Sequence, residues 1–370
     1  GNLFADDNNC DKGDHARLVY IVEDGDSGWN MAYQTIPAPY TAGPWFAEKM
    51  WHLPHPGQPA WLVPPGGKIG TGPSGFLFTS GTTLPKRYEN SFIMCNYAGG
   101  RGLEAFKVKP KGAGFEIDDY HDFLTPIMAT DAEFGPDGKL YISDFVNLDW
   151  GGKSLGGRIY TVFDQEKINT DEAQRVKKLF AEGFDKQPAR ELEKLLGHPE
   201  QKVRMRAQQT LVKLVKQNAG KEQGVFGMYA LGFAAAKDKP VVQRLHAIWG
   251  LAQVVKSDAG AIAKITENLN DGEAEVRAQV AKALGDMKHE ASAGKLVELL
   301  ADANPRVKFF AAQSLGKLGH KPAVEPLFKV IATNNDTDPW LRHACVAALA
   351  KIDAAEAVNA KATDANASVR

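Results

Sequence analysis

The sequence has little cysteine. Three cysteines occur in 370 residues, Cys10, Cys95 and Cys345, and they form neither a CxxC nor a CxxCH pattern. So few thiols exclude a disulfide-rich scaffold, and this segment carries no motif for attaching a c-type haem. The count leaves the redox compartment open, because either a Cys10–Cys95 bridge or buried free thiols would agree with it.

Long apolar runs and nucleotide-binding motifs are also missing. No apolar run reaches the roughly 18 residues that a membrane span needs. The absence of a P-loop, or of GxGxxG within a βαβ pattern, argues against a nucleotide-dependent enzyme. The chain begins with Gly1 and ends in residues 367–370, which resemble the start of a helix. We therefore expect an internal segment of a longer protein, so missing targeting signals say nothing about location.

Charge is divided unevenly along the chain, although the net charge is only −1. Residues 1–174 hold 14 Lys and Arg against 23 Asp and Glu, whereas residues 175–370 hold 30 against 22. The acidic front half suits cation binding, and the basic back half favours an acidic partner or simply reflects a lysine-rich surface. The chain has no strong basic stripe, so we expect no nucleic-acid partner.

The first 165 residues have the pattern of short strands separated by turns. Each segment has four to six residues, is rich in β-branched and aromatic types, and is bounded by Gly, Pro, Asn or Asp. We predict strands at 18–22, 76–79, 92–95, 103–108, 139–143 and 158–162. The segments at 92–95 and 103–108 should form a hairpin. Residues 135–138, Gly-Pro-Asp-Gly, should form a tight turn that a short strand at 131–134 enters.

From about residue 175 the period becomes helical and one motif recurs. Asp or Pro precedes a Val-Arg-like pair, and Ala and Leu follow. The basic positions step by 40, 33, 31, 34 and 28 residues: Arg204, Arg244, Arg277, Lys308, Arg342 and Arg370. This spacing is typical of HEAT repeats, so we predict an all-α HEAT-repeat solenoid over 195–370, preceded by a linker helix over 169–194.

The repeated residues have a physical role in such an array. Asp or Pro starts the second helix of a repeat, and small Ala lets its helices approach closely. Each unit is too small to bury its own core, so stability comes from contacts between neighbours. We expect structural ion pairs in which Asp271, Asp302 and Asp338 bind the basic residues Arg277, Lys308 and Arg342 respectively.

Three segments, 2–29, 88–108 and 130–162, resemble the six-bladed β-propeller of soluble glucose/sorbosone dehydrogenases. A propeller followed by HEAT repeats is similar to membrane-bound dehydrogenases of planctomycete-type bacteria, in which a cytochrome c domain often follows. The resemblance implies an all-β partial propeller over 1–168 whose other blades precede Gly1. It also implies oxidation of a carbohydrate or alcohol, electron transfer to a haem domain outside this segment, and a periplasmic or cell-envelope location.

Residues 6–15 form a dense polar cluster of carboxylates and amides. A hard divalent cation accepts six to eight oxygen ligands and would relieve the repulsion, whereas a solvated turn with Asx caps is the plain alternative. In the resembled enzymes the matching loop binds Ca²⁺ and approaches the quinone cofactor. By position the best matches to this loop are Asn8, Asn9 through its carbonyl, and Asp14, and the resemblance also implies Asn8 at the cofactor. Asp7 and Asp11 are neighbours that could join the cation ligands.

A quinone-dependent dehydrogenase also needs a base, usually His, and cationic clamps for the cofactor's carboxylates. In the resembled enzymes the base lies in an early blade, which this segment lacks. Where those enzymes place paired arginines, this chain has residues 127–130, Ile-Met-Ala-Thr. Arg101 stands one position from the expected lysine, so it is the remaining candidate to hold pyrroloquinoline quinone (PQQ).

Two functions therefore compete. One is a sugar or alcohol dehydrogenase with Ca²⁺ and PQQ. The alternative is a non-catalytic propeller and HEAT scaffold that binds glycans or protein partners. The departures from the clamp pattern favour the scaffold, and surfaces of helical repeats commonly bind proteins.

Overall fold

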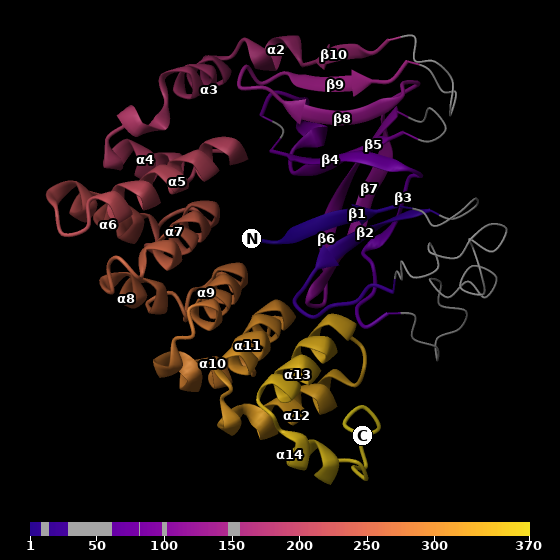
Figure 1. Ribbon diagram of the computed structural model, residues 1–370, viewed down its shortest axis with the longest axis vertical. Coiled ribbons are helices and arrows are strands. Elements are labelled where there is room, and N and C mark those ends of the chain that lie inside the picture. Colours follow the sequence, from indigo (N-terminus) through magenta and orange to yellow (C-terminus); the bar gives the residue numbers. More distant parts are fainter. Residues whose placement is uncertain (9–14, 29–60, 81, 98–101, 147–155) are drawn as a thin grey trace. The chain divides into compact units, whose positions relative to one another are not determined.

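The protein was analysed as a computed structural model that describes residues 1–8, 15–28, 61–80, 82–97, 102–146 and 156–370. The chain divides into two compact units, Gly1–Lys178 and Leu179–Arg370. The first consists mainly of strands and the second of helices (Figure 1).

Three antiparallel sheets make up the first unit. The first sheet contains, in order, β1 (Leu3–Asp7), β2 (Ala16–Ile21) and β3 (Gly67–Ile69). The second contains β4 (Pro73–Thr79), β5 (Ser91–Asn96), β6 (Gly102–Lys111) and β7 (Gly114–Leu124). The third contains β8 (Ala129–Phe134), β9 (Leu140–Asp144) and β10 (Arg158–Val162), and a short 3₁₀ helix, Lys86–Tyr88, lies between β4 and β5.

The second sheet is apolar on both faces. Strand β5 is buried along its whole length, and successive side chains of a strand point to opposite faces. One face packs against the first sheet through a cluster that includes Phe92, Met94, Phe106, Leu18 and Ile69. The other packs against the third sheet through a cluster that includes Ile93, Cys95, Leu103, Leu140 and Ile142. The three sheets therefore stack face to face in chain order.

All six predicted strands are present, β8 is the strand expected to enter the 135–138 turn, and β5 pairs with β6 as the predicted hairpin. The 135–138 turn closes through a hydrogen bond from the Gly138 N–H to the Gly135 carbonyl at 3.0 Å. Strands β1, β3 and β7 were not predicted; β7 carries a polar run, Asp-Asp-Tyr-His-Asp, that lacks the usual strand composition. Cys95 is a free buried thiol, as the second of the two alternatives for the cysteines expected, and Cys10 lies outside the described residues. Ring closure into six blades stays a prediction.

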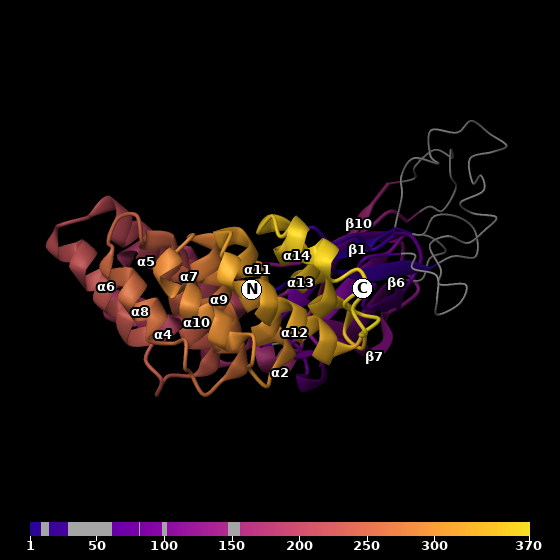
Figure 2. The ribbon, with the colours of Figure 1, turned by 90° about the horizontal axis from the view of Figure 1, so that it is seen from below.

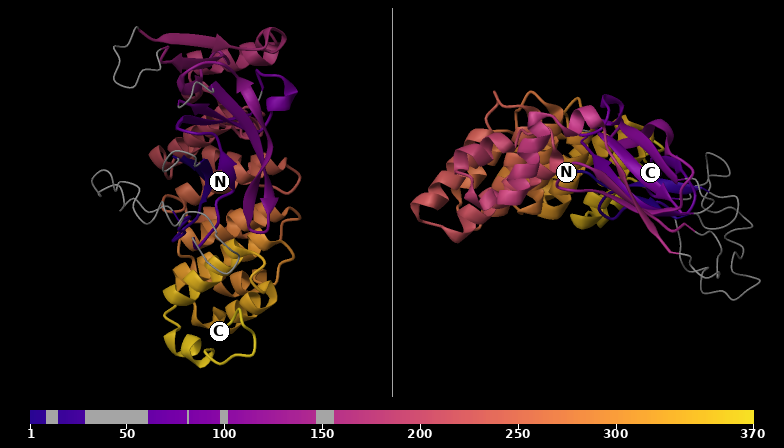
Figure 3. Two further views of the ribbon diagram at one scale, coloured as in Figure 1. Left: turned by 90° about the vertical axis from the view of Figure 1, so that its right-hand side faces the viewer. Right: turned by 90° about the horizontal axis from the view of Figure 1, so that it is seen from above.

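The second unit is a two-layered helical array (Figure 1, Figure 2). One layer holds the odd-numbered helices α5 (Gln201–Gln217), α7 (Val241–Val254), α9 (Ala274–Asp286), α11 (Pro305–Leu318) and α13 (Pro339–Lys351). The other holds the even-numbered helices α4 (Ala189–Leu195), α6 (Glu222–Ala234), α8 (Gly260–Thr266), α10 (Ala293–Leu299), α12 (Val324–Asn334) and α14 (Ala355–Ala360). Figure 3 gives two further views of this stacking, which confirms the predicted helical solenoid.

Shorter helices complete the chain. Helices α2 (Gln165–Ile168) and α3 (Asp171–Glu182) connect the last strand to the array, and single 3₁₀ turns lie at Phe184–Lys186, Glu290–Ser292 and Lys321–Ala323. The odd-numbered helices begin where the sequence pattern places them. At α11, for example, the Asn304 side chain accepts a hydrogen bond from the Arg306 N–H at 2.9 Å, and Pro305 occupies the first turn.

Arginine–aspartate pairs join successive repeats, but the predicted register is wrong by one repeat. Arg277 on α9 donates from Nε and Nη2 to the two Asp302 oxygens at 2.8 and 3.0 Å, and Asp302 lies in the turn before α11. It reaches Asp271 only at the backbone carbonyl, at 2.7 Å. Arg244 on α7 is the residue that pairs with the Asp271 carboxylate, and both side chains are buried. Arg244 and Arg277 therefore reach forward to the next turn, whereas Arg342 pairs with Asp336 in the turn before its own helix instead of with the predicted Asp338.

Asp271 and Asp302 each bind an arginine and also fix a turn, which explains why they pair with the arginine of the preceding repeat. The Asp271 and Asp302 side chains also accept backbone N–H groups two residues on, each at 2.8 Å, and so fix the turn. Burial alone would raise the pKa of Asp302, but hydrogen bonds from Arg277 and from the Asn304 N–H, with the Arg277 charge, hold it below its ordinary value. The carboxylate therefore stays ionised within its pair.

A buried histidine joins α5 to α7. Arg204 Nε donates to His246 Nε2 at 3.2 Å, so Nδ1 must carry the proton that it shares with Gln208 Oε1 at 2.7 Å. Burial, together with the Arg204 charge, lowers the pKa of His246 to about 3. The ring is consequently neutral and fixed in one tautomer.

We predict that loss of an inter-repeat arginine destabilises the array in proportion to burial. Arg244→Ala should cost about 3–5 kcal/mol because it leaves a buried carboxylate unpaired. Arg277→Ala should cost about 1.5–3 kcal/mol, since its pair is partly exposed. Lys295→Ala, which breaks the exposed pair with Glu298, is the control and should change the free energy of unfolding by less than about 1 kcal/mol. Urea unfolding measures all three, and an unchanged Arg277→Ala curve would contradict the pairing.

We also predict an acid-sensitive contribution from His246. The unfolded ring binds a proton near its ordinary pKa of 6.5 and the folded ring only near 3, so stability should fall as pH drops below about 6.5. The slope should reach at most about 1.4 kcal/mol per pH unit. Urea unfolding at pH 7.5, 6 and 5 should give a flatter dependence for His246→Gln than for the native chain. Parallel curves would show that the ring is not held neutral.

Candidate functional site

The predicted cation loop lies only partly within the residues that the structure describes. Asp7 is the last residue of β1, and Asn8 follows it at an exposed position. Asn9, Asp11, Asp14 and the predicted cofactor residue Arg101 lie outside the described residues.

Asp7 forms an ion pair with the buried Arg17. Its carboxylate accepts hydrogen bonds from the Arg17 backbone N–H at 3.0 Å and from Arg17 Nε at 3.1 Å. Arg17 is fixed in turn by the Ser27 carbonyl, 2.8 Å from Nη1. A cation at Asp7 would have to compete with this ion pair.

The strand ends around β1 are acidic and partly desolvated. Burial raises the pKa of Asp6, and the charge of Asp7 adds to this, although a backbone hydrogen bond acts in the opposite direction. Burial, with the charges of Asp131 and Asp6, raises the pKa of Cys95 to about 12. This thiol stays protonated near neutral pH and is unsuited to nucleophilic chemistry. Among the described residues, no three His, Cys, Asp or Glu side chains are grouped to hold a metal ion.

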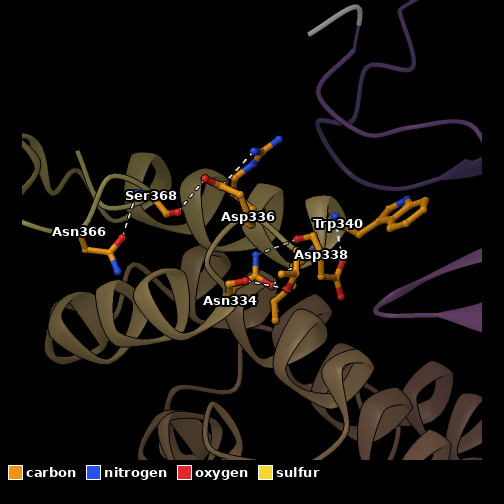
Figure 4. Close-up of polar contacts among 9 residues, drawn as sticks. Asn334, Asp336, Asp338, Trp340, Asn366 and Ser368 are labelled. Atoms are coloured by element: carbon orange, nitrogen blue, oxygen red, sulfur yellow. Dashed lines mark hydrogen bonds and ion pairs between the residues drawn. The ribbon is translucent and has the colours of Figure 1, made fainter. Parts of the chain in front are cut away.

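The turn between α12 and α13 gathers polar residues for a structural purpose (Figure 4). Asn334 Nδ2 donates to the Asp338 carbonyl at 3.0 Å, and Asp338 Oδ1 accepts the N–H of Trp340 at 3.1 Å. Asp338 therefore caps α13, and Pro339 follows in the first turn of the helix.

Asp336, in the same turn, joins the last residues of the chain to the array. Its carboxylate accepts a hydrogen bond from Ser368 Oγ at 2.7 Å and one from Arg342 Nη1 at 3.0 Å. Both interactions hold the pKa of Asp336 below its ordinary value. Figure 4 shows Ser368 and Asn366 beside this turn, so these acidic side chains serve repeat packing.

Helix α6 carries the candidate binding surface. Its sequence, EQGVFGMYALGFA, is apolar on all sides after the first two residues. One side is buried against its neighbours through residues that include Ala230, Leu231 and Ala234. Four large apolar side chains remain exposed, with exposed fractions of 44, 51, 72 and 58%: Val225, Phe226, Tyr229 and Phe233.

A groove of about 600 Å³ runs between α6 and α8. The α6 wall is apolar and includes Val225, Met228, Tyr229 and Phe233. The opposite wall, from the α7–α8 turn and α8, is polar and consists of Asp258, Gly260, Lys264, Glu267 and Asn268. The volume suits a small ligand or a few anchoring side chains of a larger partner.

Sequence reasoning missed this surface. The sequence of α6 did contain an indication. A helix that is apolar on all sides is either buried or has an apolar face that a partner can cover. The motif spacing identified the odd-numbered helices, because these carry the Arg, Ala and Leu repeat. Helix α6 lies between two of them in the sequence and carries no such motif. The helices within the described residues include none with the length and apolar content of a membrane span.

Comparison with known proteins supports the repeat array. A profile for HEAT repeats matches residues 231–307 and 294–360. No curated protein matches the sequence. Human deoxyhypusine hydroxylase in complex with glycerol is 20% identical over 44% of this chain and 73% of its own, with a TM-score of 0.29.

Two artificial proteins are similar to the chain at the same level. An engineered protein is 18% identical over 50% of this chain and 92% of its own, with a TM-score of 0.32. A designed armadillo repeat protein is 18% identical over 50% and 95%, with a TM-score of 0.31. The profile match carries the conclusion that residues 231–360 are HEAT repeats.

Proposed function

We propose that the helical array is a scaffold that binds a protein partner, and that the exposed face of α6 belongs to the binding surface. The carrying observation is the set of four exposed apolar side chains at positions 225, 226, 229 and 233. Contiguous apolar surface on a soluble protein marks interaction sites, and stacked helical repeats provide extended surfaces for partners.

Tyr229 and Phe233 are the best candidates for anchors of this interaction. They lie four residues apart on α6, so both face the same side of the helix. Aromatic side chains bring a large apolar area at low entropic cost and are enriched among the residues that dominate binding energy. Lys239 already lies over the Phe233 ring at 3.9 Å, which holds that ring at the surface.

For the first unit, we propose that the stacked sheets belong to a six-bladed propeller of the glucose/sorbosone dehydrogenase type. In support, the middle sheet is apolar on both faces, as in radially packed blades. The outward faces of the outer sheets also expose apolar side chains, Leu3 and Ile21 on one and Ile159 on the other. Further sheets would cover them.

A second candidate function, oxidation of a sugar or alcohol by this propeller, is favoured by the carboxylates at the end of β1. Burial and the Asp7 charge raise the pKa of Asp6, and a cation bound nearby would oppose both by favouring the ionised carboxylate. Because Asp7 is paired with Arg17, Ca²⁺ would depend on Asn8 and on loop residues such as Asp11 and Asp14. When bound, PQQ would supply the hydride acceptor.

We predict that Ca²⁺ stabilises the full chain if this second function is correct. At a concentration 100 times its dissociation constant, the gain should be about 2.7 kcal/mol, and it should be lost in Asp14→Asn. Thermal unfolding with EDTA, Ca²⁺ and Mg²⁺ measures the gain, and dye reduction with aldoses and PQQ measures turnover. If the chain shows no Ca²⁺-specific stabilisation and no turnover, the dehydrogenase proposal is wrong.

For the scaffold, we predict that Tyr229→Ser combined with Phe233→Ser weakens partner binding at least tenfold and leaves the melting temperature nearly unchanged, because both side chains are exposed. A photoreactive residue at position 226 should cross-link a discrete partner in an extract of the source cells, and the double variant should reduce that product. Val346→Ser, at an exposed apolar position on α13, is the matched control. Equal cross-linking in all variants would contradict the proposed surface.

A further inference from the structure

We infer that the groove between α6 and α8 takes a short amphipathic helix of a partner protein, with its apolar face on α6 and a basic flank toward α8. This inference rests on the scaffold function. Three features carry it: the unequal lengths of the two helices, the different chemistry of the two walls, and the fact that both walls are helices without a strand edge.

The groove exists because α8 is too short to cover α6. At 1.5 Å per residue, the 13 residues of α6 extend about 20 Å, and the seven residues of α8 only about 10 Å. The helices come close near Gly232, where an added Cβ would lie 3.6 Å from the aliphatic part of Lys264. The first half of α6, with Val225 and Phe226, therefore extends beyond α8.

Because one wall of the groove is apolar and the other is charged, a matching occupant has one apolar and one charged face. The α6 wall offers aliphatic and aromatic side chains, whereas the α8 wall carries Asp258, Glu267 and Lys264. Lys264 pairs with Glu267 at 3.2 Å, so the wall has an excess of one negative charge. Asn268, at the edge of the groove, is buried and donates from Nδ2 to the Lys264 carbonyl at 3.0 Å, so the charge of the wall comes from the other three side chains. A Lys or Arg side chain on the occupant would complement this wall.

A helix fits these walls better than an extended peptide. Both walls are helices, whose interior backbone groups are bonded along the helix axis, so an extended peptide would find no strand edge to pair with. A helix satisfies its own backbone and presents apolar side chains at positions i, i+3 or i+4, and i+7. It would lie beside α6 as an additional member of the even-numbered layer.

A phage-displayed library of random 16-residue peptides, selected on the full chain, tests this inference. We expect selected peptides with apolar residues spaced i, i+3 or i+4, i+7 and with Lys or Arg on one flank. Synthetic copies should gain helical circular dichroism on binding. Tyr229→Ser with Phe233→Ser should raise the dissociation constant at least tenfold in fluorescence anisotropy, and Val346→Ser should change it less than twofold.

The inference is overturned if the selected peptides are rich in proline or bind without gaining helicity. It is also overturned if they bind the double variant as well as the native chain. A dimer of the full chain in sedimentation that the double variant abolishes would make a second copy the occupant and overturn it as well. If the groove selects no helical peptide while cross-linking to a partner from position 226 persists, the scaffold function stands and the amphipathic-helix inference fails.

Discussion

The helical unit depends on contacts between one repeat and the next. A single helix pair buries too little apolar surface to be stable, so each odd-numbered helix must be held to its neighbours. The arginine–aspartate pairs do this where the apolar seam ends, at the turns. Arg244 and Arg277 reach forward to Asp271 and Asp302, and each aspartate also fixes the turn that starts the next helix. One side chain thereby sets both the local fold and the spacing of repeats.

This arrangement separates structural from functional constraints. The odd-numbered layer carries the pairs and the repeated motif, so its helices have similar lengths, from 13 to 17 residues. The even-numbered layer is freer to vary, from six residues in α14 to 13 in α6. The mismatch between α6 and α8 follows from that freedom, and it leaves apolar side chains exposed. The surface that we propose for binding is therefore a consequence of how the array is held together.

The sequence indicated what depends on local pattern. The recurring Arg, Ala and Leu spacing predicted the solenoid, and β-branched runs predicted six strands. It did not predict the pairing register, because a motif places Arg277 near two aspartates and only the helix geometry decides which carboxylate it reaches. Strand β7 was missed because its central run, Asp-Asp-Tyr-His-Asp, is polar and mostly exposed. The α6 surface was missed because apolar residues at every position also describe a buried helix. The residues proposed for Ca²⁺ and PQQ were taken from the family resemblance. The geometry of the described residues does not by itself identify them.

The most direct test of this account is a double-mutant cycle on Arg277 and Asp302. The free energy of unfolding is measured for the native chain, Arg277→Ala, Asp302→Ala and the double variant. Because the two side chains share two charge-assisted hydrogen bonds between successive repeats, the account predicts a coupling energy of about 1–3 kcal/mol. A coupling energy below about 0.3 kcal/mol, within the range expected of independent sites, would contradict it.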